Sequence, residues 1–179
     1  NQKLEDTAQS IYTEWFVNFE FPDKNGKPYK SNGGEMVYCD ELDMEIPKGW
    51  SIDSLENYVN CNSSTFSKKD KFEKIKYLDT SSITNNKIDN IQILDVDKDV
   101  IPSRAKRKVK HNSILYSTVR PNQEHFGIVE KNEIDNLIVS TGFATIDVIS
   151  KDILPKFLFY KLTQPFITNY LQGIAENSV

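Results

Sequence analysis

The chain has 179 residues, of which 38% are hydrophobic and 27% are charged, and its formal net charge is −4. This length and composition indicate a soluble, folded chain of one domain, or one domain with an appendage, and exclude an intrinsically disordered protein. The apolar runs are far shorter than the roughly 18 residues of a membrane span, and the polar start is no signal peptide, so we expect a cytoplasmic protein without membrane contact.

Residues 1–20 have the pattern of an amphipathic helix. Apolar side chains recur at intervals of three or four residues, the spacing of a coiled-coil seam: Leu4, Ala8, Ile11, Trp15 and Phe19. Such a helix can pack on its own domain, or it can lie between domains or against a partner. Because the chain does not begin with Met and the pattern starts abruptly, we expect a longer helix that continues from upstream.

Residues 21–45 are predicted to form a linker. The stretch PDKNGKPYKSNGG within it is rich in Gly, Pro, Asn and Lys, which favour loops and turns. The sequence IPKGW then begins an extended segment, because its proline disfavours helical backbone before it and its glycine permits a turn. The expected organisation is therefore the end of a helix at 1–20, a linker at 21–45 and a domain at 46–179.

The rest of the chain has the pattern of an α+β domain. Residues 52–59 allow a short helix, and residues 74–79 predict a strand whose apolar residues pack inward. From 113 to 148, short apolar and β-branched runs alternate with turn residues, which indicates mostly β structure. The end is helical, and Pro165 either breaks this helix or begins a second one. The predicted fold class is α+β, with a mixed or antiparallel β core, flanking helices and one protruding N-terminal helix of the coiled-coil type.

The sequence lacks the motifs of common catalytic and metal sites. Cys39 and Cys61 are far from each other and from both histidines, so we expect a reducing environment and no zinc site. Residues 95–99, DVDKD, begin like a calcium loop, but Val100 replaces the required Gly and Lys106 the required Glu. Neither a phosphate-binding glycine loop nor a methyltransferase or nuclease motif occurs. We therefore expect a non-catalytic protein without metal or cofactor.

Positive charge is concentrated in the middle third of the chain. The formal charge is −7 over residues 1–60, +5 over 61–128 and −2 over 129–179. Within the middle third, residues 102–122 hold six Lys or Arg and no Asp or Glu. Because local potential attracts phosphate more than net charge does, this third is a candidate nucleic-acid surface. The alternative is a solvated, Lys-rich surface.

Three stretches of this third are candidates for nucleic-acid contacts. The basic residues at 104–110 are too dense for one face of a helix or strand, so we expect a loop that presents several of them together. The turn at 120–122 combines an arginine, suited to guanine, with an asparagine, suited to adenine. The stretch at 67–76 is a weaker, Lys-rich patch. The candidate DNA-binding residues are Lys68, Lys69, Arg104, Lys106, Arg107, Lys108, Arg120 and Asn122. For each stretch alone, turn chemistry and solubility are the alternative explanation.

Five stretches occur in an order that matches a known family: AQSIYTEWFVNFEFP, IPKGW, YLDTSSI, PSRAKRKVKHNSILYSTVRPN and STGFATI. In this order they resemble a junction in the specificity (S) subunit of type I restriction-modification systems. At that junction a conserved helix ends and the second target recognition domain begins. The resemblance covers essentially the whole chain.

The resemblance implies a non-catalytic reader of duplex DNA. In the family, two target recognition domains each read half of a split site. Conserved helices dock methyltransferase (M) subunits, and the restriction (R) subunit joins the larger complex. Leu4, Ile11 and Trp15 would then face another helix or an M subunit, and the three basic stretches would face DNA. Only one recognition domain is present and the chain stops at GIAENSV, so we expect a fragment with a truncated C-terminal end.

Two other functions stay open. The chain can be a protein-interaction module that acts through its N-terminal helix, with basic loops that only keep it soluble. It can also be the recognition part of a fused restriction-methyltransferase enzyme. The sequence upstream of Asn1 would distinguish a fused enzyme from a separate S subunit.

Overall fold

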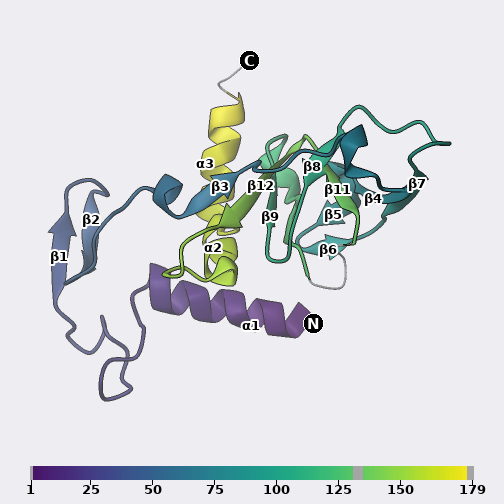
Figure 1. The fold of residues 1–179 in the computed structure, drawn as a ribbon. Helices are drawn as coiled ribbons and strands as arrows, with labels where there is room; N and C mark the ends of the chain where they lie inside the picture. The colour runs from purple at the N-terminus through teal and green to yellow at the C-terminus, as the bar shows by residue number, and fades with distance from the viewer. Residues whose placement is uncertain (1, 131–134, 177–179) are drawn as a thin grey trace. The chain divides into compact units, whose positions relative to one another are not determined.

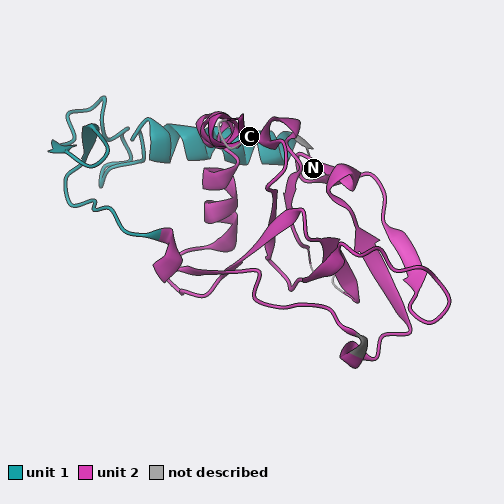
Figure 2. Cartoon of the chain, turned by 90° about the horizontal axis from the view of Figure 1, so that it is seen from above, with its two compact units in different colours: residues 1–54 teal, residues 55–179 magenta. Residues whose placement is uncertain are grey.

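A computed structural model describes residues 2–130 and 135–176, apart from the side chains of residues 2 and 68. The chain divides into two compact units, which we call unit 1 (residues 1–54) and unit 2 (residues 55–179) (Figure 2). Most helices and strands are labelled in Figure 1.

Unit 1 begins with helix α1 (Gln2–Tyr12), which continues as one π-helical turn, η1 (Thr13–Val17). The predicted helix therefore exists, but the seam does not extend to Phe19. The helix ends at Val17, and Phe19 has a left-handed backbone with φ 61°. Phe19 is instead buried with Cys39 and Ile46 in the small core of unit 1. The predicted seam is wrong at this last position because the π turn and the left-handed residue end the helical periodicity.

The predicted linker at 21–45 is folded, so this prediction is wrong. Strand β1 (Met36–Cys39) pairs antiparallel with β2 (Met44–Pro47), and the expected domain start at residue 46 lies inside β2. The ring of Phe21 stacks on Tyr29 and on Trp50, with centroids 4.6 and 5.6 Å apart. The turn residues do form turns, but the aromatic side chains between them supply a core of their own.

Unit 2 contains two four-stranded sheets. The first has the order β10-β9-β12-β3 and is antiparallel: β3 (Val59–Cys61), β9 (Ile114–Ser117), β10 (Phe126–Ile128) and β12 (Phe143–Val148). The second has the order β7-β4-β11-β8: β4 (Lys74–Leu78), β7 (Gln92–Asp95), β8 (Ala105–Lys108) and β11 (Leu137–Ser140). This second sheet is mixed, because β11 runs parallel to β4 and antiparallel to β8. The predicted α+β class with a mixed or antiparallel core is confirmed.

Shorter elements and two helices complete unit 2 (Figure 1). A two-stranded ribbon is formed by β5 (Ile83–Thr84) and β6 (Lys87–Ile88). The 3-10 turns are η2 (Leu55–Asn57), η3 (Lys68–Asp70), η4 (Thr80–Ser82) and η5 (Pro121–Gln123). The helices are α2 (Pro155–Leu162) and α3 (Pro165–Glu176), so Pro165 begins a second helix. The short helix expected at 52–59 is only η2, because Val59 already pairs with β12 as part of β3.

The core of unit 2 joins both sheets and helix α2. Ile114 and Phe126 of the first sheet pack in one cluster with Leu158 of α2. A second cluster joins the sheets themselves, since it contains Leu115 of β9 and Val139 of β11. These buried residues come from the apolar runs that predicted strands. Among the described residues, no helix is long and apolar enough to cross a membrane.

Candidate nucleic-acid interface

The basic segment expected to be a loop is largely strand β8, so that prediction is wrong. Ala105 pairs with Ser140 of β11, whereas Arg107 pairs with the preceding residue, Val139. Lys106 is therefore the extra residue of a β-bulge. Because a bulge changes which side of the sheet successive residues face, dense positive charge does not exclude a strand here.

The Lys-rich patch at 67–76 lies beside β8. The backbone N–H of Lys108 donates to the carbonyl oxygen of Ser64 over 3.0 Å. The Lys108 ammonium also forms an ion pair with the Asp70 carboxylate. The hydrogen bond from Lys108, followed by one from the Ser67 backbone, holds the pKa of Asp70 below its ordinary value. Two of the three predicted basic stretches are thus brought together.

Lys110 lies next to a buried carboxylate. Its Nζ is 3.6 Å from Oδ2 of Asp147, whose side chain is 7% exposed. This carboxylate also accepts hydrogen bonds from Ser113 Oγ at 2.5 Å and from Ser63 Oγ at 2.7 Å. Lys110 therefore compensates a charge inside the protein, which makes it less suited to binding phosphate than an unpaired cation.

Three other basic residues of the segment differ in exposure. Arg104 and Lys106 are exposed, and neither forms an ion pair within the described part of the chain. Arg107 is half-buried, and its Nε has no hydrogen-bond partner among the described residues. Arg104 and Lys106 are therefore the residues of this segment best placed to contact a phosphate or a base edge.

In the Lys-rich patch, Lys69 is exposed on the 3-10 turn η3. The Ser67 side chain caps this turn by accepting a hydrogen bond from the Lys69 N–H over 3.3 Å. The turn is further held by Asp70, whose carboxylate accepts the Ser67 N–H over 2.7 Å. Lys68 is in the same turn, but its side chain lies outside the part of the chain that the structure describes.

The third stretch, at 120–122, is a 3-10 turn supported by helix α3. Arg120 is exposed and has a left-handed backbone with φ 50°, while Pro121 after it is buried. Asn122 is exposed, and its N–H donates to the Gln172 side chain of α3 over 3.4 Å. The proline and the helix together fix the direction in which the Arg120 and Asn122 side chains leave the surface.

The turn between β11 and β12 connects two of the basic stretches. The N–H of Thr141 donates to the carbonyl oxygen of Arg104 over 2.9 Å. The carbonyl oxygen of Gly142 accepts the Thr118 N–H at 2.9 Å and the Thr118 hydroxyl at 3.1 Å. Thr118 is two residues before Arg120, so both arginine segments are tied to one turn. Neither threonine is among the site residues predicted from the sequence, although the stretches STGFATI and SILYSTV contain them.

The end of strand β4 reaches the same turn, since a methyl group added at Gly142 would lie 2.8 Å from Cγ2 of Thr80. The Tyr77 hydroxyl donates to Asp79 Oδ1 over 3.2 Å, and the Ser81 hydroxyl donates to Asp79 Oδ2 over 3.3 Å. Burial raises the pKa of Tyr77, and both the Asp79 carboxylate and the Arg104 guanidinium influence it electrostatically. Segments from β4, β8, β9 and the β11–β12 turn therefore meet at one place.

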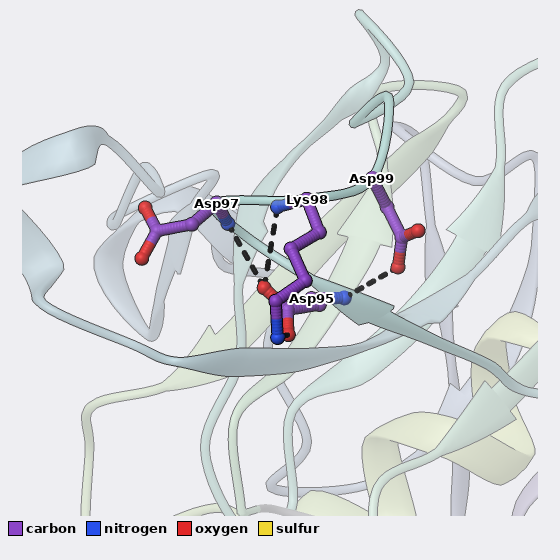
Figure 3. A network of polar contacts seen from close by, with 4 residues as sticks. All are labelled: Asp95, Asp97, Lys98 and Asp99. Carbon is purple, nitrogen blue, oxygen red and sulfur yellow. Dashed lines mark hydrogen bonds and ion pairs between the residues drawn. The ribbon is translucent and has the colours of Figure 1, made fainter.

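The acidic stretch at 95–99 is a self-contained turn (Figure 3). Asp95 Oδ1 accepts the N–H groups of Asp97 and Lys98, each at 3.2 Å, and Asp99 Oδ2 accepts the Asp95 N–H at 2.7 Å. The Lys98 ammonium is 3.1 Å from Asp95 Oδ2. These carboxylates bond to their own backbone, and the described residues contain no cluster of three or more potential metal ligands.

Comparison with known proteins gives consistent relatives, although no family model matches the chain. Over 106 residues, 59% of this chain, it is 36% identical to the type I restriction enzyme HindI specificity subunit of Haemophilus influenzae. Over 65 residues it is 38% identical to the type I restriction enzyme MjaIX specificity subunit of Methanocaldococcus jannaschii. This chain is homologous to part of the type I restriction specificity subunits. The aligned segments span only 22% and 13% of these two relatives.

Solved structures agree with this homology at the level of the fold. The specificity subunit HsdS from Thermoanaerobacter tengcongensis aligns over 62% of this chain and 30% of its own, with a TM-score of 0.50 and 24% identity. A chain from a structural study of complex assembly in a type I R-M system aligns over 65% of this chain and 32% of its own, with a TM-score of 0.51 and 24% identity. The resemblance to type I specificity subunits that the sequence predicted is confirmed.

Proposed function

We propose that this homologue of the specificity subunits is a target recognition domain that binds duplex DNA in a sequence-dependent way. The observation that supports the proposal is that an ion pair and backbone hydrogen bonds link the segments of unit 2 that carry exposed basic and amide side chains: Lys69, Arg104, Lys106, Arg120 and Asn122. Homology to specificity subunits supports a role in choosing the target of a type I restriction-modification system.

Different residues have different roles in this proposal. Lys69 and Lys106 are exposed cations without the planar fork of arginine, so they suit phosphate oxygens and hold the register on the duplex. Arg104 and Arg120 can donate two hydrogen bonds to a guanine edge, and Asn122 can pair with adenine. Lys108 contributes less, because its ammonium is already paired with Asp70. Methylation and cleavage are assigned to M and R subunits, and unit 2 supplies recognition alone.

A randomised duplex library tests the proposal. The chain is incubated with the library at low salt, where few phosphate contacts suffice for binding, and the retained DNA is sequenced. We expect enrichment of a motif of a few base pairs. Retention without enrichment would contradict sequence-dependent binding, and no retention at low salt would contradict DNA binding itself.

The exposed side of helix α1 favours a second role in subunit assembly. Leu4, Ile11 and Trp15 are 73, 46 and 39% exposed, which is unusual for large apolar residues at regular helical spacing. We propose that they contact another conserved helix or an M subunit. Since they are exposed, replacing Leu4 and Ile11 with Ser is expected to leave unit 1 folded.

Co-purification with the M subunit measures this role. The double variant Leu4→Ser/Ile11→Ser is expected to lose M-subunit binding while it keeps DNA binding. Ser10→Ala, an exposed change on the same helix but off the seam, is the matched control and should retain both. Full retention of M-subunit binding by the double variant would assign the contact to another surface.

A further inference from the structure

The turn at Thr141–Gly142 connects strands of two different sheets and is also hydrogen-bonded to two other segments of the chain. It links β11 of the second sheet to β12 of the first. On one side the Thr141 N–H is bonded to Arg104, and on the other the Gly142 carbonyl is bonded to Thr118. The turn therefore holds two segments that are distant in sequence and that both carry an exposed arginine.

Close packing leaves this turn little freedom to move. A methyl group added at Gly142 would lie 2.8 Å from Cγ2 of Thr80, so no larger residue fits without displacing its neighbour. The Gly142 N–H also donates to Ser140 Oγ over 3.2 Å. Gly142 is buried, whereas Thr141 beside it is exposed. A rigid turn of this kind can hold the residues bonded to it in a fixed geometry.

The hydrogen bonds limit the distance between the two arginines. Hydrogen-bonded residues have Cα atoms about 5.5 Å apart, and consecutive residues about 3.8 Å. The path between the Cα atoms of Arg104 and Arg120, through Thr141, Gly142 and Thr118, is then at most about 22 Å. At 3.4 Å per base pair this Cα path corresponds to about six base pairs of duplex, and the two arginine side chains extend the reach to about one helical turn of about 10 base pairs. Both arginines can therefore act on one half-site.

We infer that Arg104 and Arg120 form one base-reading centre, that the Thr141–Gly142 turn positions them, and that the exposed Thr141 side chain contacts DNA between them. The inference rests on the proposed DNA binding and names the residues that give it specificity. Guanidinium forks recognise the O6 and N7 acceptors of guanine, and a threonine can donate to a base or pack its methyl on thymine.

Arginine-to-lysine exchanges test the base-reading part. Lysine keeps the charge for phosphate but loses the bidentate fork. In the library selection, Arg104→Lys and Arg120→Lys are each expected to reduce the preference at one or two motif positions by about 10- to 100-fold, with the salt dependence unchanged. The affected positions should lie within about one helical turn, about 10 base pairs, of each other. Lys106→Ala is the control: it should weaken binding to all sequences equally and keep the motif.

Gly142→Ala tests the positioning part. The added methyl forces the turn and Thr80 apart, so we expect preference to fall at the Arg104 and Arg120 positions together, while Thr141→Val should affect only positions between them. Thr118→Val removes one hydrogen bond to Gly142 with little change in volume. This variant tests the same positioning role if Gly142→Ala does not fold. Thermal unfolding of each variant shows that the chain is folded.

The outcomes separate this inference from the proposed function. A motif that persists with full preference in both lysine variants would overturn the reading centre while leaving DNA recognition intact. Affected positions further apart than about one helical turn, about 10 base pairs, would also overturn it. A folded Gly142→Ala or Thr118→Val variant with normal preference would overturn the positioning role. If the unaltered chain enriches no motif, the proposed function fails first.

Discussion

The basic segment at 104–110 has two halves with two basic residues each, Arg104 and Lys106 in the first and Lys108 and Lys110 in the second. Their environments differ. Arg104 and Lys106 are exposed and in no ion pair within the described residues. Lys108 is paired with Asp70, and Lys110 lies 3.6 Å from Asp147. A run of basic residues in the sequence therefore does not by itself predict a cationic surface, because acidic residues from distant segments neutralise part of it.

The acidic partners come from separate elements of unit 2. Asp70 is 38 residues from Lys108 in sequence and lies in the turn η3, and Asp147 lies in β12 of the other sheet. One half of the segment is therefore used to join parts of the protein, and the other half is available for a ligand. Measurements of stability report on the first use, and measurements of DNA binding report on the second.

The largest effect is expected from Asp147→Ala. The change removes the acceptor of the buried Ser113 hydroxyl and the partner of Lys110, so we expect a loss of about 2–3 kcal/mol in the free energy of unfolding. Urea denaturation measures it. Asp147→Asn keeps one acceptor oxygen and should lose less. An unchanged unfolding midpoint in Asp147→Ala would mean that the contacts of this carboxylate with Ser113 and Lys110 do not stabilise the fold.

A matched pair of double variants separates the two halves directly. Arg104→Ala/Lys106→Ala and Lys108→Ala/Lys110→Ala each remove two positive charges. We expect the first to lower the slope of log K against log salt by about 0.9, since Lys106 is the proposed phosphate contact of this pair and each such contact contributes about 0.9. The second should change the slope by less than about 0.5, because its lysines already have acidic partners. Equal changes in both variants would show that total charge decides binding.

Arg107 has the same predicted role as Arg104, since both are candidate DNA-binding residues. Alanine at both positions is expected to lower the affinity for DNA. Since Arg107 is half-buried and its Nε is buried, we expect most of that change to come from Arg104. Measuring the two single variants separately distinguishes their contributions.

Much of the fold of unit 2 could be predicted because its strands are short apolar runs between turn residues. Strand β4 and the β-rich region from β9 to β12 follow this rule, and their buried residues are the apolar ones. Strand β8 does not follow it, because only Ala105 is fully buried and its place depends on pairing with β11. Long-range pairing of this kind leaves no local pattern in the sequence.

The candidate site could be predicted in part for a related reason. Its charged residues are visible as composition, which identified the Arg104 and Arg120 segments. Thr141 and Gly142 were missed because they join those segments through backbone hydrogen bonds, which no side-chain pattern reveals. The π turn after α1 was missed likewise, since the apolar spacing continues past the residue at which the helix ends.

The smallest effect is expected from Asp70→Asn, and it depends on pH. The hydrogen bond from Lys108 lowers the pKa of Asp70 below 3.8, so the charged form stabilises the folded state above that pH, and this stabilisation is lost as the pH falls through the lowered value. The difference in thermal midpoint between the unaltered chain and Asp70→Asn should therefore be largest near pH 7 and shrink below pH 3.8. Asp97→Asn, at an exposed carboxylate (Figure 3), is the control and should show no such trend. A difference that stays constant with pH would mean that the ion pair with Lys108 is not what stabilises this side of β8, and Lys108 would then be available to DNA like Lys106.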